Sequence, residues 1–216
     1  MQADAAELRV LGCLIEKQRT TPDAYPLSLN ALRIACNQST NRDPVVEYDD
    51  ATIRQALERL NHKGWLRLAS GPGSRAAKFR HLFDEAMHVS DEEISILAVL
   101  MLRGPQTPGE LKQRTQRLQP FADLAELEAS LQGLIERELV ERLPRQPGQK
   151  EQRYRHLLEE EAIPRAAPAV GQQEREPEPE PEPDRLDAFE RDLRELRDEV
   201  AALRAELTSE RGGPLE

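Results

Sequence analysis

The sequence contains few cysteines and few aromatic residues. Among 216 residues there are two cysteines, Cys13 and Cys36, which form no CxxC pair. This pattern excludes a disulfide framework and a cysteine-based zinc site. Aromatic residues make up 4% of the chain, so its cores must consist mainly of Leu, Ile, Val and Ala. Both cysteines fall on apolar faces of predicted helices, which indicates buried thiols.

Signals for membrane insertion, export and catalysis are missing as well. No apolar run approaches the roughly 18 residues of a membrane span, and residues 2–7 lack the basic and apolar regions of a signal peptide. We therefore expect a cytoplasmic protein without membrane association. The chain has no Gly-rich phosphate loop, no HExxH and no Ser/His/Asp pattern. We expect no enzymatic activity, no catalytic residue, no cofactor and no metal site.

One pattern of helix and strands occurs twice. Residues 53–83 contain an apolar helical stripe, a strand, a Gly/Ser turn and a second strand with the sequence Arg-His-Leu near its end. Residues 127–158 repeat this order, and Arg-His-Leu returns there. A helix followed by strand–turn–strand is the second half of a winged helix. The repeat predicts a mostly α, tandem winged-helix protein with small β-hairpin wings, an α+β fold. The repeated His81 and His156 indicate a shared packing or hydrogen-bonding role.

Local signals place the elements of each copy. In the first copy we predict helices at 4–18 and 27–36, and a third helix that starts at Asp49 and ends before Gly64. In the second copy Ser90 and Glu93 have the spacing of a capping box, and the third helix is predicted at 122–137. Residues 37–48 have no counterpart in the second copy.

We expect four regions along the chain, each of the first two with a modest core of its own. They are winged-helix domain 1 at 1–86, winged-helix domain 2 at 87–163, a Pro/Glu-rich disordered linker at 164–184 and a heptad coiled-coil helix at 185–210.

The last region carries apolar residues at alternating spacings of three and four, which is the seam of a coiled coil. In a parallel dimer its g and e′ positions would bear opposite charges. This predicts self-association, most simply as a dimer. The seam consists of Leu186, Phe189, Leu193, Leu196, Val200, Leu203 and Leu207.

The net charge of −10 is unevenly distributed. Residues 1–90 carry a net charge of +1, residues 91–165 carry −3, and residues 166–216 carry −8. The two predicted domains are therefore close to neutral, which is less basic than a dedicated DNA-binding protein usually is.

Several stretches resemble the uncharacterised bacterial YceH-like family, also called UPF0502 or DUF480. The most specific is LSLNALRIACNQSTNRDPV at 27–45, and further matches are LGCLIEK, TTPDAYP, GSRAAKFRH and LRGPQTPGEL. The resemblance covers about residues 5–160 and leaves the linker and heptads outside. It implies a tandem winged-helix fold and implies no activity.

Winged helices usually place their third helix in the major groove of DNA and their wing on the backbone. The third helix and wing of domain 1 offer Arg and Gln side chains that suit base edges and phosphates, although Glu58 and the opening Asp49 and Asp50 oppose them. We therefore predict that domain 1 binds double-stranded DNA in a regulator-like role. The candidate nucleic-acid-binding residues are Arg42, Arg54, Gln55, Arg59, Arg75, Lys78 and Arg80. For Arg42 a structural alternative is favoured, in which it pairs with Asp43 or Asp49.

The corresponding helix of domain 2 presents Gln132, Glu128 and Glu136 and no cation, although its wing is basic. Such a face suits a protein better than DNA. The alternative function is therefore a non-enzymatic protein–protein adaptor that uses its winged helices as docking surfaces for an unknown protein partner.

Overall fold

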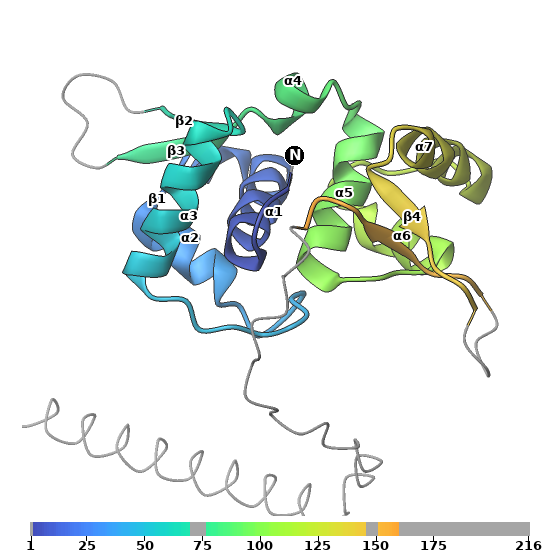
Figure 1. Cartoon of the computed structure of the whole chain (residues 1–216), viewed down its shortest axis with the longest axis horizontal. Coiled ribbons are helices and arrows are strands. Elements are labelled where there is room, and N and C mark those ends of the chain that lie inside the picture. The colour runs from blue at the N-terminus through green and yellow to red at the C-terminus, as the bar shows by residue number, and fades with distance from the viewer. Residues whose placement is uncertain (1, 70–76, 146–150, 160–216) are drawn as a thin grey trace, which may run out of the picture. The chain divides into compact units, whose positions relative to one another are not determined.

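The computed structural model describes residues 2–69, 77–145 and 151–159, which form two halves with the same order of elements (Figure 1). The fold is mostly helical with small antiparallel sheets and belongs to the α+β class. Each half has three helices followed by a two-stranded hairpin, an arrangement consistent with a winged helix.

In the first half, β3 is the central strand of a three-stranded antiparallel sheet with the order β1-β3-β2. Leu27 of β1 lies opposite Phe79 of β3, and Leu66 of β2 lies opposite His81. The elements are α1 (Ala5–Thr20), the 3-10 helix η1 (Pro22–Ala24), β1 (Leu27–Ser28), α2 (Leu29–Cys36), α3 (Asp50–His62), β2 (Leu66–Leu68) and β3 (Lys78–His81).

The short helix α4 (Phe83–Met87) leads into the second half. There β4 pairs with β5, and Gln106 takes the place of the third strand through two backbone hydrogen bonds with Tyr154, of 3.0 and 2.8 Å. The elements are α5 (Asp91–Arg103), α6 (Pro108–Thr115), α7 (Leu124–Glu136), β4 (Val140–Arg142) and β5 (Tyr154–His156).

The helix ends confirm the local signals. Asp49 caps α3 by accepting a hydrogen bond from the backbone N–H of Thr52. Ser90 and Glu93 form the predicted capping box of α5. Gly64 has φ +71°, a left-handed conformation that favours glycine just after a helix.

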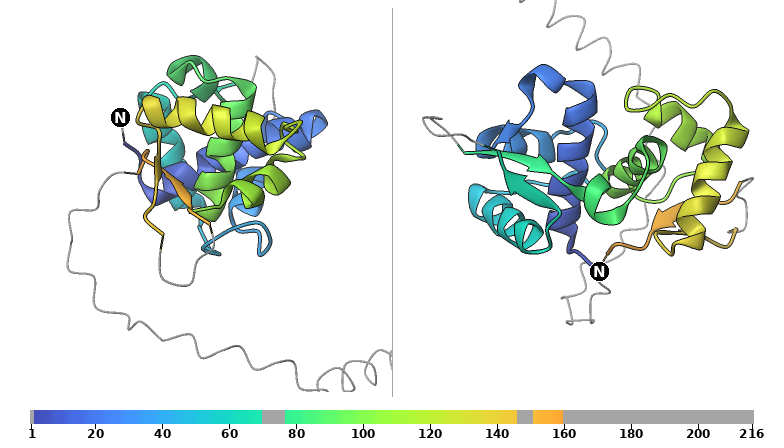
Figure 2. Two further views of the ribbon diagram at one scale, coloured as in Figure 1. Left: turned by 90° about the vertical axis from the view of Figure 1, so that its right-hand side faces the viewer. Right: turned by 90° about the horizontal axis from the view of Figure 1, so that it is seen from above.

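Helices α1 and α5 lie against each other and join the two halves (Figures 1 and 2). Residues 7–15 of α1 and residues 94–102 of α5 are buried without a break, so each helix is covered on all sides rather than along one stripe. Arg19 of α1 also forms an ion pair with Asp91 at the start of α5. The buried apolar residues of both halves form one continuous cluster.

The expectation of a separate core in each half is therefore wrong. Residues 1–162 form one compact unit, because the first helix of each half packs on that of the other. The predicted boundary between residues 86 and 87 falls inside α4. The predicted linker at 164–184 and the coiled coil at 185–210, with its seam from Leu186 to Leu207, lie outside the described residues.

Gly12 permits the close approach of α1 and α5. A Cβ built on Gly12 would come within 2.9 Å of Leu102 Cγ and 3.3 Å of Met101 Cβ. Both neighbours lie inside the core, where packing leaves little room to move.

We expect Gly12→Val to lower the free energy of unfolding by about 1–3 kcal/mol through overpacking of this contact. Urea denaturation of the full chain measures the change. Gly109→Val is the matched control, because a Cβ on Gly109 meets nothing within 4 Å. Equal effects of the two substitutions would show that the α1–α5 contact is not tightly packed.

Candidate functional site

The predicted DNA-binding residues of α3 and the first hairpin lie at the surface. Arg54 and Gln55 are exposed on α3, and Lys78 is exposed on β3. Arg54 Nη2 lies 3.7 Å from Asp50 Oδ2, and the half-buried Arg80 donates a hydrogen bond of 3.1 Å to Glu85. Exposed ion pairs of this kind contribute little stability and can be exchanged for other anions.

The structure does not group the other three predicted DNA-binding residues with these. Arg59 pairs with Asp4, the residue that caps α1, so its guanidinium is directed along the side of α3 that faces α1. Arg75 lies outside the described residues. Arg42 is buried and is described below.

The structure adds Arg67 to this surface. Arg67 is exposed on β2 and lies opposite Arg80 of β3 in the strand register. The sequence placed Arg67 in a strand, but only the pairing of the strands shows that it lies beside Arg80. We call Arg54, Gln55, Arg67 and Lys78 the α3–hairpin face.

The equivalent region of the second half has a different charge. Helix α7 contains no Lys or Arg, and Glu126, Glu128 and Glu136 are exposed on it. The arginines of its hairpin contact their own half: Arg142 lies over the ring of Tyr154 at 5.5 Å, and Arg155 pairs with Glu141.

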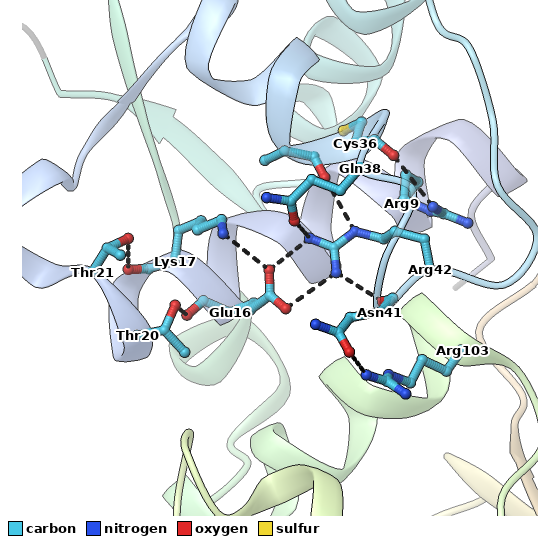
Figure 3. Close-up of polar contacts among 11 residues, drawn as sticks. Arg9, Glu16, Lys17, Thr20, Thr21, Cys36, Gln38, Asn41, Arg42 and Arg103 are labelled. Atoms are coloured by element: carbon cyan, nitrogen blue, oxygen red, sulfur yellow. Dashed lines mark hydrogen bonds and ion pairs between the residues drawn. The ribbon is translucent and has the colours of Figure 1, made fainter. Parts of the chain in front are cut away.

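Arg42 is the most buried of the predicted cationic residues, since its side chain has no exposed surface. Its two terminal nitrogens donate to Glu16 over 3.1 and 2.6 Å, and a third bond of 2.9 Å reaches Gln38 (Figure 3). Its Nε donates to the backbone oxygen of Ala35 over 3.1 Å. Burial is the largest single influence and opposes the charge on Arg42, but hydrogen bonding and charge from Glu16 and Cys13 together outweigh it and raise the pKa of the guanidinium.

These contacts correct the role predicted for Arg42. Its guanidinium is fully engaged inside the protein, so it is unavailable to a phosphate at the surface. The structural alternative is closer to the observed arrangement, but the predicted partners Asp43 and Asp49 are wrong, because the carboxylate that pairs with Arg42 comes from Glu16 on α1.

The segment 37–48, which the second half lacks, holds Arg42 in this place. Asn37 closes the segment through two hydrogen bonds with the backbone of Tyr48, of 2.8 and 2.9 Å. Arg9 of α1 donates to Pro44 O over 2.6 Å, and the Asp43 N–H donates to Leu102 O over 2.9 Å. The segment therefore contacts α1 of its own half and the end of α5 in the other.

A polar cleft of about 610 Å³ lies beside this segment, between the two halves. Lys17 of α1 and Thr40 contribute from the first half, and the cations of the second half are Arg103, Arg114 and Arg117. Val99 and Leu102 of α5 supply apolar surface. We call this space the inter-half cleft.

The cations of the inter-half cleft have few anionic partners. Arg103 donates to the neutral side-chain amide of Asn41, and Arg114 lies 3.9 Å from Glu110 (Figure 3 shows Arg103 and Asn41). The side chain of Arg117 forms no hydrogen bond or ion pair within the described part of the chain. Burial, together with the charges of Arg114 and Arg42, lowers the pKa of Arg103. The cleft thus gathers positive charges that repel one another.

No pattern in the sequence predicted this cleft. Its lining residues come from α1 and the turn after it, the segment 37–48, α5, and α6 with the residues that follow it, and no motif or spacing connects them. Arg117 lies in a polar stretch of sequence, where an arginine is usually an ordinary solvated side chain. Only the packing of the helices shows that it lines a cleft.

The two cysteines lie in the core. Cys13 and Cys36 are free and buried, as predicted, and their contact together with burial raises the pKa of the Cys36 thiol. Within residues 2–69, 77–145 and 151–159, no three His, Cys, Asp or Glu side chains are grouped so that they could hold a metal ion. No helix among the described residues is long and apolar enough to cross a membrane.

Comparison with known proteins identifies the family. Residues 3–149 match the family described as "Protein of unknown function, DUF480". The chain belongs to the DUF480 family. Its relatives include a UPF0502 protein of Geobacter metallireducens, 54% identical over 157 residues, which are 72% of this chain and 71% of the relative.

Other DUF480 relatives align over nearly their whole length. A UPF0502 protein of Pectobacterium atrosepticum is 43% identical over 211 residues, covering 94% of this chain and 99% of the relative. A UPF0502 protein of Shewanella sp. strain ANA-3 is 41% identical over 218 residues, covering 96% of this chain and 100% of the relative. The likeness to these bacterial proteins therefore extends into the C-terminal region that the sequence placed outside the shared part.

We expect Glu16→Ala to lower the free energy of unfolding by about 2–4 kcal/mol, because it leaves the buried Arg42 charge without its carboxylate. Chemical denaturation measures the loss. Glu85→Ala is the control, since Glu85 is exposed and its bond to Arg80 is worth less than about 1 kcal/mol. A similar small loss for both would mean that the Arg42–Glu16 pair is solvated.

We also expect acid to destabilise the protein through His81. Burial lowers the pKa of His81 to about 4, and its Nε2 contacts Gln18 Oε1. The unfolded chain takes up this proton near pH 6.5 and the folded chain only near pH 4, so stability is lost as pH falls between these values. His81 should contribute a loss of about 2 kcal/mol between pH 7 and pH 5.

Denaturation of the His81→Gln variant at both pH values tests this, and its pH dependence should be smaller than that of the unaltered chain. His62→Gln, on the exposed side of α3, should keep the full pH dependence. The same pH dependence in all three proteins would assign the effect to other groups.

Proposed function

We propose that this protein is a tandem winged-helix protein that binds double-stranded DNA through the α3–hairpin face of its first half, in a non-enzymatic, regulator-like role. The observation that carries the proposal is the exposure of Arg54 and Gln55 on α3 and of Arg67 and Lys78 on the hairpin that follows it. Arg and Gln can form bidentate contacts with base edges, and Arg and Lys neutralise phosphates.

The architecture supports this assignment. Each half has three helices followed by a hairpin, which is consistent with a winged helix, and in that fold the third helix and the wing face the duplex together. The ion pairs of Arg54 with Asp50 and of Arg80 with Glu85 are exposed and can be exchanged for phosphate contacts. Self-association through the heptads at 185–210 remains part of the proposal and would present two such faces to a palindromic site.

A second candidate function rests on α7. Its exposed glutamates repel DNA, and Leu124 at its start is 41% exposed. This surface fits a protein–protein adaptor, and in that case the second half would bind a protein partner with a complementary cationic surface.

The test is binding of a random-sequence duplex to the full chain at about 50 and 200 mM salt. We expect affinity to fall with salt, because phosphate contacts release counterions. Arg54→Ala together with Arg67→Ala should weaken binding about tenfold or more and make the slope of log K against log salt shallower by about 2.

Arg142→Ala together with Arg155→Ala removes the same charge from the hairpin of the second half and is the matched control. We expect it to change affinity less than about twofold, because both side chains are engaged within their own half. Failure of the full chain to bind the duplex at 50 mM salt would contradict the proposal and favour the adaptor. Equal weakening by both pairs would contradict the assignment to the first half.

A further inference from the structure

The inter-half cleft has the size of a small-molecule site. Its volume of about 610 Å³ lies within the range of about 300–1,000 Å³ that is usual for ligand pockets. It combines apolar surface from Val99 and Leu102 with polar walls, as ligand sites commonly do.

The positive charge of the cleft favours an anionic ligand. Glu16 is the one carboxylate among its lining residues, and both oxygens of that carboxylate accept hydrogen bonds from Arg42. Lys17 is 3.6 Å from the same carboxylate.

The three arginines of the second half are not neutralised in this way. Arg103 donates to the neutral amide of Asn41, and Arg114 lies 3.9 Å from the carboxylate of Glu110. The side chain of Arg117 has no hydrogen-bond or ion-pair partner among the described residues.

Several arginines around one space suit phosphate in particular. Each guanidinium offers a planar fork of N–H donors, and a phosphate group presents several oxygens that can accept from more than one fork. An organic phosphate would also have a non-ionic part that the apolar surface of α5 could cover.

We propose that the inter-half cleft binds a small organic phosphate of about mononucleotide size, whose phosphate group is held by Arg103, Arg114 and Arg117. This inference is independent of DNA binding by the α3–hairpin face. Because Lys17 and Thr40 belong to the first half and the three arginines to the second, the ligand contacts both halves. It therefore binds the folded unit and not the unfolded chain, and it raises the melting temperature.

Inorganic pyrophosphate is the probe, titrated into the full chain by calorimetry at constant ionic strength, with thermal unfolding as a second readout. We expect saturable binding and a higher melting temperature. Arg114→Gln together with Arg117→Gln should weaken pyrophosphate binding at least about tenfold, since two charge-assisted contacts are lost.

Arg54→Gln together with Arg67→Gln is the matched control, since it removes the same charge from the α3–hairpin face. We expect its pyrophosphate affinity to equal that of the unaltered chain. The single variant Arg117→Gln guards against a folding defect, because the Arg117 side chain forms no hydrogen bond or ion pair with the described residues, and it should also weaken binding.

Three results would overturn the proposal. They are the absence of binding at millimolar pyrophosphate, equal affinities of the cleft variant and its control, and displacement of pyrophosphate by a short DNA duplex. The last result would assign the phosphate chemistry of the cleft to a nucleic-acid backbone. Loss of duplex binding in the Arg54 and Arg67 variant, with pyrophosphate binding retained, would support two separate sites.

Discussion

The packing of α1 against α5 is the contact on which the rest of the structure depends. Gly12 lets the two helices approach until Leu102 and Met101 fill the space that a side chain would need. Both helices are buried over nine consecutive residues, so neither half can cover its first helix alone. The hydrophobic free energy of both halves is thereby shared, and they form one core instead of two.

This shared core determines where charged groups can lie. The segment 37–48 crosses from the first half to the end of α5, and it places Arg42 over α1, where Glu16 neutralises it. A buried arginine is tolerated because its N–H groups meet a carboxylate, an amide and backbone oxygens. The same arrangement leaves Arg103, Arg114 and Arg117 along a cleft with little negative charge, which is the basis for the proposed phosphate site.

The two halves use one architecture for different surfaces. Exposed arginine, lysine and glutamine lie on α3 and its hairpin, whereas α7 exposes glutamates. The core positions of the two third helices are alike, with Leu57 and Leu60 in one and Leu131 and Leu134 in the other. Buried positions are constrained by packing, while exposed positions on the same helix are free to take either charge.

The sequence by itself determined the helices, their caps, the hairpins and the family, because these depend on residues within a few positions of one another. Asp49, Ser90 and Gly64 act at the helix ends where their local patterns predicted them. Only the tertiary structure decided the single core, the partner of Arg42 and the inter-half cleft. Glu16 and Arg42 are 26 positions apart, and Asn41 and Arg103 are 62 apart. No local pattern encodes such pairs. The first pair forms when the segment 37–48 packs on α1, and the second forms when that segment meets the end of α5 in the other half.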